Sequence, residues 1–224
     1  AACISFKIGI GSNYFYEIAK IRSLKRLWSK IVNAYSPEHA CSHNCPITAV
    51  IGHMNKSLND PHTNMLRQTT EVMSAANAGV DGVVVLPYDL MSLNGPSELA
   101  ERLALNISSI LKEESYLDKV IDPIGGSYSL EKLTELIGRK SWESFKILDA
   151  KGGVFEKQAL EALITEIVSK RSQKIKQFTE GNSILIGVNK YRNGDKADEK
   201  WKETNVYLGM KQLIFEKEHK TTAV

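Results

Sequence analysis

Apolar residues recur at steps of three and four along five stretches of this chain, which predicts five amphipathic helices. The first stretch carries Ile18, Ile21, Leu24, Trp28 and Ile31, with charged residues on the remaining face. Four further helices are predicted: 64–78, one that starts at Asn94-Gly95-Pro96 and carries Leu99 to Ile110, one from Gly126 to Leu148, and 155–179. The chain is therefore expected to be rich in helix.

Short β-prone runs precede four of these helices. They are Ile4–Ile10, Pro46–Ile51, Gly82–Leu86 and Lys119–Ile124. The run Gly82–Leu86 is continuously apolar, which is typical of a strand buried on both faces. Four strands, each followed by a helix, favour parallel pairing with helical crossovers. The pattern predicts the α/β class and half of a (β/α)8 TIM barrel, about four βα units.

A further short strand, Ser183–Asn189, is predicted after the fifth helix, and from Arg192 onward the sequence becomes polar and charged. We therefore expect a barrel domain over residues 1–191 and a linker or partly ordered tail over 192–224. The chain begins without methionine, and we interpret it as part of a longer protein.

The charge balance excludes some classes of partner. The chain has 29 Lys+Arg and 26 Asp+Glu, a formal net charge of +3, which is too weak to favour nucleic acid or an anionic membrane. No apolar run approaches the ~20 residues of a spanning helix. The 3 cysteines show no disulfide framework, and no secretory signal is present, so we expect a cytoplasmic protein.

The segment HACSHNC offers His39, Cys41, His43 and Cys45 as candidate metal ligands, because imidazole and thiolate suit zinc. Structural zinc sites usually space paired ligands by two to four residues on turns, whereas these stand at every second position. The alternative is a surface loop. We expect no metal site.

The segment from His53 to Asn64 could present His53, Lys56 and His62 to an anionic ligand. The alternative is that these residues are solvated or cap the next helix.

Two carboxylates, Asp89 and Asp122, stand at the carboxyl ends of predicted strands, and Gly125-Gly126 follows the second. Barrel enzymes place their chemistry at this end of the strands, and glycines let the backbone approach a ligand. Both acids could equally cap the next helix or orient a tight turn, so both interpretations stay open here.

Four stretches of the sequence resemble the methylmalonyl-CoA mutase family. They are Gly9–Trp28 (GIGSNYFYEIAKIRSLKRLW), Asn64–Asp89 (NMLRQTTEVMSAANAGVDGVVVLPYD), Asn106–Thr134 (NISSILKEESYLDKVIDPIGGSYSLEKLT) and Ile184–Tyr191 (ILIGVNKY). The resemblance covers nearly everything from Ile4 to Tyr191. It implies the C-terminal half of a (β/α)8 barrel that binds an acyl-CoA, with adenosylcobalamin at the carboxyl face. It further implies a radical interconversion of (R)-methylmalonyl-CoA and succinyl-CoA.

The departures from that pattern bear on the role of the chain. Catalytic members carry Thr-His-x-Gln-Thr-Ser-Gly-Trp after the second strand, where this chain has Thr48–His53. They carry His-Thr-Asn and an Asp-Glu pair after the next strand, where this chain has Val84–Asp89. An arginine that meets the CoA phosphates is replaced by Cys3, although Ser5 is kept. Apolar side chains cannot replace these contacts, so we expect no catalytic and no cofactor-binding residue here.

This pattern resembles the small, non-catalytic subunits of heterodimeric members of the family. The resemblance implies a homologous catalytic large subunit as partner, which would bind the acyl-CoA and the adenosylcobalamin. Two alternatives remain: a catalytic acyl-CoA mutase with an altered cobalamin face, and a non-enzymatic binding protein on the same fold. A half barrel leaves strand edges open, so we also expect the isolated 224 residues to be unstable or to aggregate.

Overall fold

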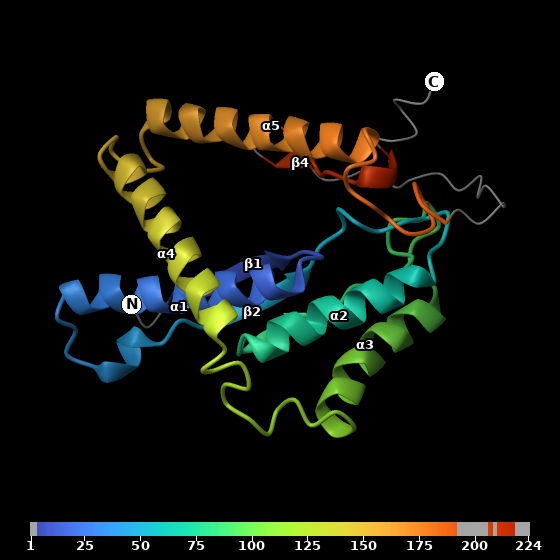
Figure 1. Ribbon diagram of the computed structural model, residues 1–224, viewed down its shortest axis with the longest axis horizontal. Coiled ribbons are helices and arrows are strands. Elements are labelled where there is room, and N and C mark those ends of the chain that lie inside the picture. The colour runs from blue at the N-terminus through green and yellow to red at the C-terminus, as the bar shows by residue number, and fades with distance from the viewer. Residues whose placement is uncertain (1–3, 192–205, 208–209, 218–224) are drawn as a thin grey trace. The chain divides into compact units, whose positions relative to one another are not determined.

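The computed structural model describes residues 4–191, 206–207 and 210–217 of the chain. Its helices and strands are drawn in Figure 1. In chain order they are β1 (Phe6–Ile10), α1 (Tyr14–Ala34), the 3-10 helix η1 (Ala40–His43), β2 (Ile47–Ile51), α2 (Thr63–Asn77), β3 (Gly82–Val84), α3 (Glu98–Glu113), α4 (Tyr128–Asp149), α5 (Lys157–Thr179), β4 (Val206–Tyr207) and β5 (Met210–Lys211).

Strands β1, β2 and β3 form one parallel sheet in that order. Phe6 lies opposite Ile47 in the register of the first pair, and Thr48 lies opposite Gly82 in that of the second. A helix follows each strand, as parallel pairing requires, because the chain must return to the same end of the sheet. The predicted α/β class is confirmed, with the parallel sheet and helical crossovers of part of a barrel.

Local signals explain where the helices begin and end. Asn13 caps α1, because its side-chain oxygen accepts a hydrogen bond from the backbone N–H of Tyr16 at 3.2 Å. Gly79 follows α2 with φ +73°, the left-handed conformation that glycine adopts without strain. The bounds of α2 and α5 lie within two residues of those predicted from the apolar spacing.

Three predictions about strands are wrong. The predicted fourth strand, Lys119–Ile124, forms turns, in which Lys119 N–H bonds to Tyr116 and Gly125 N–H to Asp122, and Ile121 is fully exposed. A strand needs a partner along its length, whereas these backbone groups are satisfied by local turns. Strand β3 was expected to be buried on both faces, yet Val84 is 40% exposed, since β2 is its one neighbour among the described strands.

The predicted short strand Ser183–Asn189 is also wrong. The backbone N–H groups of Val188 and Asn189 both bond to the carbonyl of Leu185, and Gly187 has φ +80°. The strand-like pairing described for this segment is one isolated β-bridge between Ile186 and Lys190. A left-handed glycine and a local turn are incompatible with an extended ladder.

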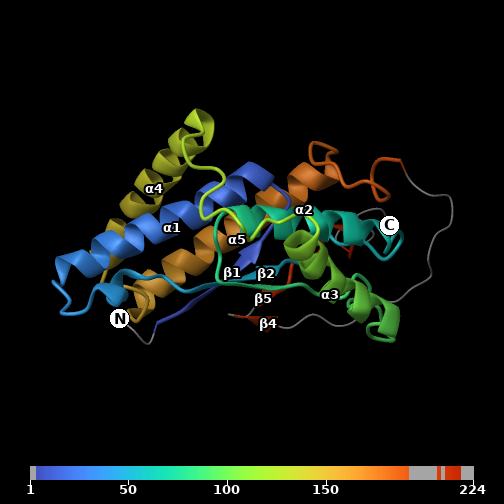
Figure 2. The same cartoon turned by 90° about the horizontal axis from the view of Figure 1, so that it is seen from below.

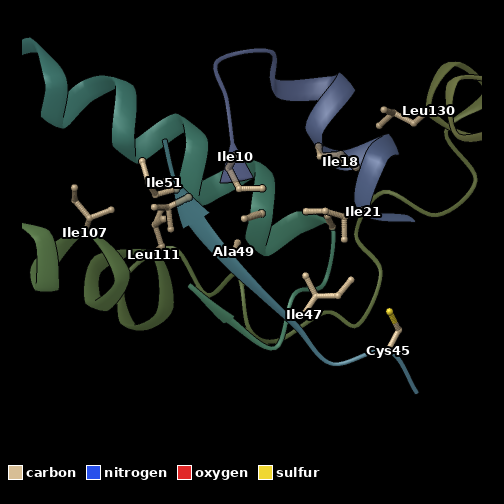
Figure 3. Packing of buried hydrophobic residues seen from close by; sticks show 13 residues of the cluster. Ile10, Ile18, Ile21, Cys45, Ile47, Ala49, Ile51, Ile107, Leu111 and Leu130 are labelled. Carbon is tan, nitrogen blue, oxygen red and sulfur yellow. The ribbon is translucent and has the colours of Figure 1, made fainter. Parts of the chain in front are cut away.

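The chain divides into two compact units, of which the first comprises residues 1–52, 67–86 and 104–145. Its core, shown in Figure 3, is a cluster of buried side chains between the sheet and the helices of this unit. The cluster contains Ile10, Ile18, Ile21, Cys45, Ile47, Ala49, Ile51, Val72, Ala75, Ala78, Ile107, Leu111 and Leu130. Burial of this apolar surface is the main term that stabilises the unit.

The second unit comprises residues 53–66, 87–103 and 146–224. Phe178 of α5 stacks on Phe215, with ring centroids 4.8 Å apart, and Leu185 and Val188 complete that cluster. The predicted tail, 192–224, lies mostly outside the described residues, so the boundary at residue 191 stays a prediction. None of the helices within the described ranges combines the length and apolar character of a membrane span.

Candidate functional site

The loops after β2 and β3 are where a parallel α/β fold places its ligand site, because they follow the carboxyl ends of strands. Four residues selected from the sequence fall in these loops: His53, Lys56, His62 and Asp89. All four belong to the second unit. The contacts of these loops therefore decide what the site can do.

Asn64 organises both loops. Its side-chain oxygen accepts from the N–H of Ser57 at 3.0 Å, and its amide nitrogen donates to the carbonyls of Ser57 at 2.8 Å and Tyr88 at 2.9 Å. The Asn64 side chain is fully buried. It thus joins the loop after β2 to the start of the loop after β3 by pairing backbone groups that would otherwise be buried without partners.

Glu216 makes the corresponding contact from the far end of the chain. Its carboxylate accepts the backbone N–H of Leu58 at 2.6 Å and that of Asn59 at 3.2 Å. The residue is 1% exposed. Its two oxygens pair two backbone donors of this turn, so Glu216 holds the turn in place. Neither Asn64 nor Glu216 was selected from the sequence.

His53, Lys56 and His62, the three candidates for binding an anion, each have a different local environment. Burial lowers the pKa of His53, and the charge of Lys56 lowers it further, so the imidazole is neutral at pH 7. Lys56 is 4% exposed and donates to the side-chain oxygen of Asn55 at 2.9 Å. His62 is exposed, with its ring 5.3 Å from that of Tyr88. These contacts do not bring the three side chains together on one ligand.

Asp89 contacts the start of the helix that follows it. One carboxylate oxygen accepts the N–H of Ser97, the residue before α3, at 3.1 Å, and its backbone carbonyl accepts from Ser92 at 2.8 Å. The hydroxyl of Ser97 itself caps α3, because it accepts the N–H of Ala100 at 3.2 Å. The contacts therefore favour a structural role, in which Asp89 holds the cap residue of the next helix.

Asp122 belongs to an ion-pair cluster in the first unit. Its carboxylate accepts from Arg22 of α1 at 2.5 Å, and Arg22 also bonds to Glu131 of α4 at 2.5 Å. Arg26 bonds to the second oxygen of Glu131 at 2.6 Å. The hydrogen bond from Arg22 holds the pKa of Asp122 below its usual value, as that from Arg26 does for Glu131. Asp122 thus joins a turn to α1, and Gly126 allows that turn with φ +83°.

The cysteine and histidine segment lies around η1. Cys41 is exposed, whereas Cys45 is buried in the first core, and that burial raises the pKa of its thiol. A thiol with a raised pKa is a poor metal ligand, because the thiolate is the binding form. Among the described residues no three His, Cys, Asp or Glu side chains gather as a metal site would need. The expected lack of a metal stays a prediction.

Residues 1–216 match the protein family described as methylmalonyl-CoA mutase. This chain belongs to the methylmalonyl-CoA mutase family. It is 41% identical over 209 residues to the methylmalonyl-CoA mutase small subunit of Porphyromonas gingivalis, covering 88% of this chain and 32% of the relative. It is 33% identical over 198 residues to the methylmalonyl-CoA mutase of Rhizobium meliloti, covering 86% and 27%.

A third mutase relative is the probable methylmalonyl-CoA mutase small subunit of Mycobacterium tuberculosis, 31% identical over 199 residues. That match covers 85% of this chain and 31% of the relative. The chain thus spans between 27% and 32% of the length of these three curated relatives.

The segments that the resemblance predicts to differ from catalytic members of the family include Cys3, part of β2 and the residues after β3. Cys3 lies outside the described residues. Residues 48–51 belong to β2, where Ala49 and Ile51 are fully buried in the core. After β3, the carbonyl of Leu86 accepts from the side chain of Gln68 at 2.7 Å. The side chains of Ala49 and Ile51 thus belong to the core of the first unit, whereas Val84 in the second segment is 40% exposed.

Proposed function

We propose that this chain is part of the small, non-catalytic subunit of a heterodimeric, adenosylcobalamin-dependent methylmalonyl-CoA mutase. Its partner is a homologous large subunit, which binds the acyl-CoA and the cofactor and interconverts (R)-methylmalonyl-CoA and succinyl-CoA in the cytoplasm. The names of two relatives, each a mutase small subunit, support this role.

The observation that carries the proposal is the internal pairing of the loops after β2 and β3. A cobalamin site needs donors and acceptors that face the ligand, whereas Asn64, Lys56 and Glu216 each bond to groups of this chain. The apolar side chains of Ala49 and Ile51 offer no hydrogen bond. These residues do not fit a corrin, and we assign no catalytic step to them.

A second candidate is a catalytic mutase with an altered cobalamin face. The relative from Rhizobium meliloti, which is named a mutase rather than a small subunit, covers 86% of this chain at 33% identity and favours it. The two candidates differ in one measurable property, which is activity of the chain without a partner.

The test uses the full-length chain, the matching large chain, and their mixture. We measure turnover of methylmalonyl-CoA with adenosylcobalamin and follow cofactor binding by absorbance. The proposal expects no turnover and no stoichiometric cobalamin for this chain alone, and a stable complex with the large chain. Turnover or stoichiometric binding by the chain alone would establish the second candidate instead. The large chain alone is the control for cofactor quality.

A further inference from the structure

Helices α1 and α4 of the first unit lie against each other, as Figures 1 and 2 show from two directions. At their contact the hydroxyl of Ser23 donates to the carbonyl of Thr134 at 2.7 Å. A Cβ added to Gly138 would lie 3.8 Å from Ser23, so small residues face each other here. Beside this contact the two helices leave a groove of about 410 Å³.

The floor of the α1–α4 groove is apolar. Leu27, Gly138 and Trp142 line it together with Ser23 and Thr134. The two hydroxyls are already used, since Ser23 bonds to backbone carbonyls and Thr134 donates to the carbonyl of Leu130 at 2.7 Å. An occupant of the floor therefore gains by burying apolar surface rather than by hydrogen bonding.

The rim of the groove is basic. It carries Lys30 and Arg139 beside one carboxylate, Glu135, and also Arg26, which already pairs with Glu131 at 2.6 Å. Lys132 already pairs with Glu135 at 2.9 Å, and together with Arg139 it lowers the pKa of Glu135. Within the described part of the chain, Lys30 has no ion-pair partner. The groove thus offers hydrogen-bond donors and positive charge, and the complementary surface is acidic.

The apolar surface continues past the groove along α4. Trp142 stacks on Phe145 with ring centroids 5.3 Å apart, and Phe145 remains 45% exposed. Exposed aromatic residues beside a groove are typical of protein interfaces, where they act as anchors. An extended apolar strip suits a segment of another protein better than a small anion.

We propose that the α1–α4 groove docks an acidic segment of the large subunit. An apolar side chain of that segment covers Leu27 and Trp142, and its carboxylates face Lys30 and Arg139. This inference rests on the proposed function, because it assigns the partner of that function to one surface of the chain.

The test is charge reversal on the full-length chain. Arg139→Glu and Lys30→Glu change exposed rim residues, whereas Lys140→Glu makes the same kind of change at the exposed neighbour of Arg139 that does not line the groove. We measure the dissociation constant for the purified large chain at low and high salt, and confirm folding by circular dichroism. Each rim variant is expected to weaken binding about tenfold and to flatten the salt dependence. Lys140→Glu is expected to stay within about twofold.

The possible results distinguish the docking groove from the proposed function on which it rests. If folded Arg139→Glu and Lys30→Glu bind the large chain as tightly as the unaltered protein does, the groove is not the docking surface and the proposed function stands. If Lys140→Glu weakens binding equally, the effect is one of total charge and the inference is overturned. If the unaltered chain binds no large chain at all, the proposed function fails and this inference fails with it.

Discussion

Strand β2 and the loop that follows it bury opposite kinds of side chain. In β2, Ile47, Ala49 and Ile51 are fully buried among apolar neighbours. In the loop, Lys56 and Ser57 are buried to a similar extent, as is their neighbour Asn64 at the start of α2, yet all three are polar and hydrogen-bonded. The strand is held by the removal of apolar surface from water, and the loop by pairing of specific polar groups. Mutations in the two regions should therefore destabilise the fold for different physical reasons.

The largest effect is expected in the strand. Ile47→Ala in the full-length chain removes a fully buried side chain and leaves a cavity, which should cost about 2–5 kcal/mol of unfolding free energy. Val84→Ala is the matched control, because Val84 lies in β3 of the same sheet but is 40% exposed. Its cost should stay below about 1 kcal/mol. Urea denaturation measures the unfolding free energy of both variants. Equal losses of stability in the two variants would contradict an apolar core centred on β2.

At the start of α2, Asn64→Ala should cost about 2–4 kcal/mol of unfolding free energy, because it leaves backbone groups of Ser57 and Tyr88 in the two loops buried without their partner. Asn64→Asp is the control. It keeps the acceptor for the N–H of Ser57 but places a carboxylate opposite two carbonyls, so it should not restore stability. Thermal denaturation compares them. Full stability of Asn64→Asp would show that the single bond to Ser57 N–H holds the loop.

Two glycines of the second unit separate conformational strain from steric contact. Gly187 and Gly181 have φ values of +80° and +77°, yet a Cβ at Gly187 would lie 2.8 Å from a carboxylate oxygen of Asp60, whereas nothing lies within 4 Å at Gly181. Gly181→Ala should cost about 1 kcal/mol and Gly187→Ala about 1–3 kcal/mol. Denaturant titration gives both values. A smaller loss at Gly187 would mean that Asp60 moves freely.

The smallest expected effect is the change of folding stability with pH. Because burial lowers the pKa of His53 in the folded chain, the unfolded chain binds more protons just below the ordinary histidine pKa of about 6.5. Stability from this residue is present above that pH and is lost as the pH falls toward the folded-state value. His53→Gln should reduce this loss, whereas His62→Gln, at an exposed position of the same loop, should change it less. Melting temperatures between pH 7 and pH 5 test the difference.

The same contrast explains what the sequence could predict. Regular spacing identified the five helices α1 to α5 and three strands, since burial of one face imposes that spacing. Val120-Ile121 also looked like a strand, but a short apolar run does not reveal whether a neighbouring strand will pair with it. Here Ile121 is fully exposed, and the turn at Asp122 is set by Arg22, 100 residues away in sequence. Such a contact leaves no local signal.

The candidate site was predictable only in part. Asp89 and Asp122 were noticeable because each acid follows an apolar run, and the structure gives both a structural contact. Glu216 left no signal, because its partners Leu58 and Asn59 lie 158 and 157 residues earlier. Asn64 could have been noticed as a polar residue at the start of a predicted helix, a position where side chains often bond to the backbone.

The stacked aromatic pair on α4 has one more consequence. Indole fluorescence shifts to shorter wavelength when water leaves its surroundings, and Trp142 is only partly covered by Phe145. Trp28 packs edge-on against Phe6 and bonds to the carbonyl of Asn44, so its emission should stay constant. In a Trp201→Phe variant, Trp142 is therefore a built-in optical reporter, whose spectral shift on mixing with another protein would show whether this face of α4 becomes covered.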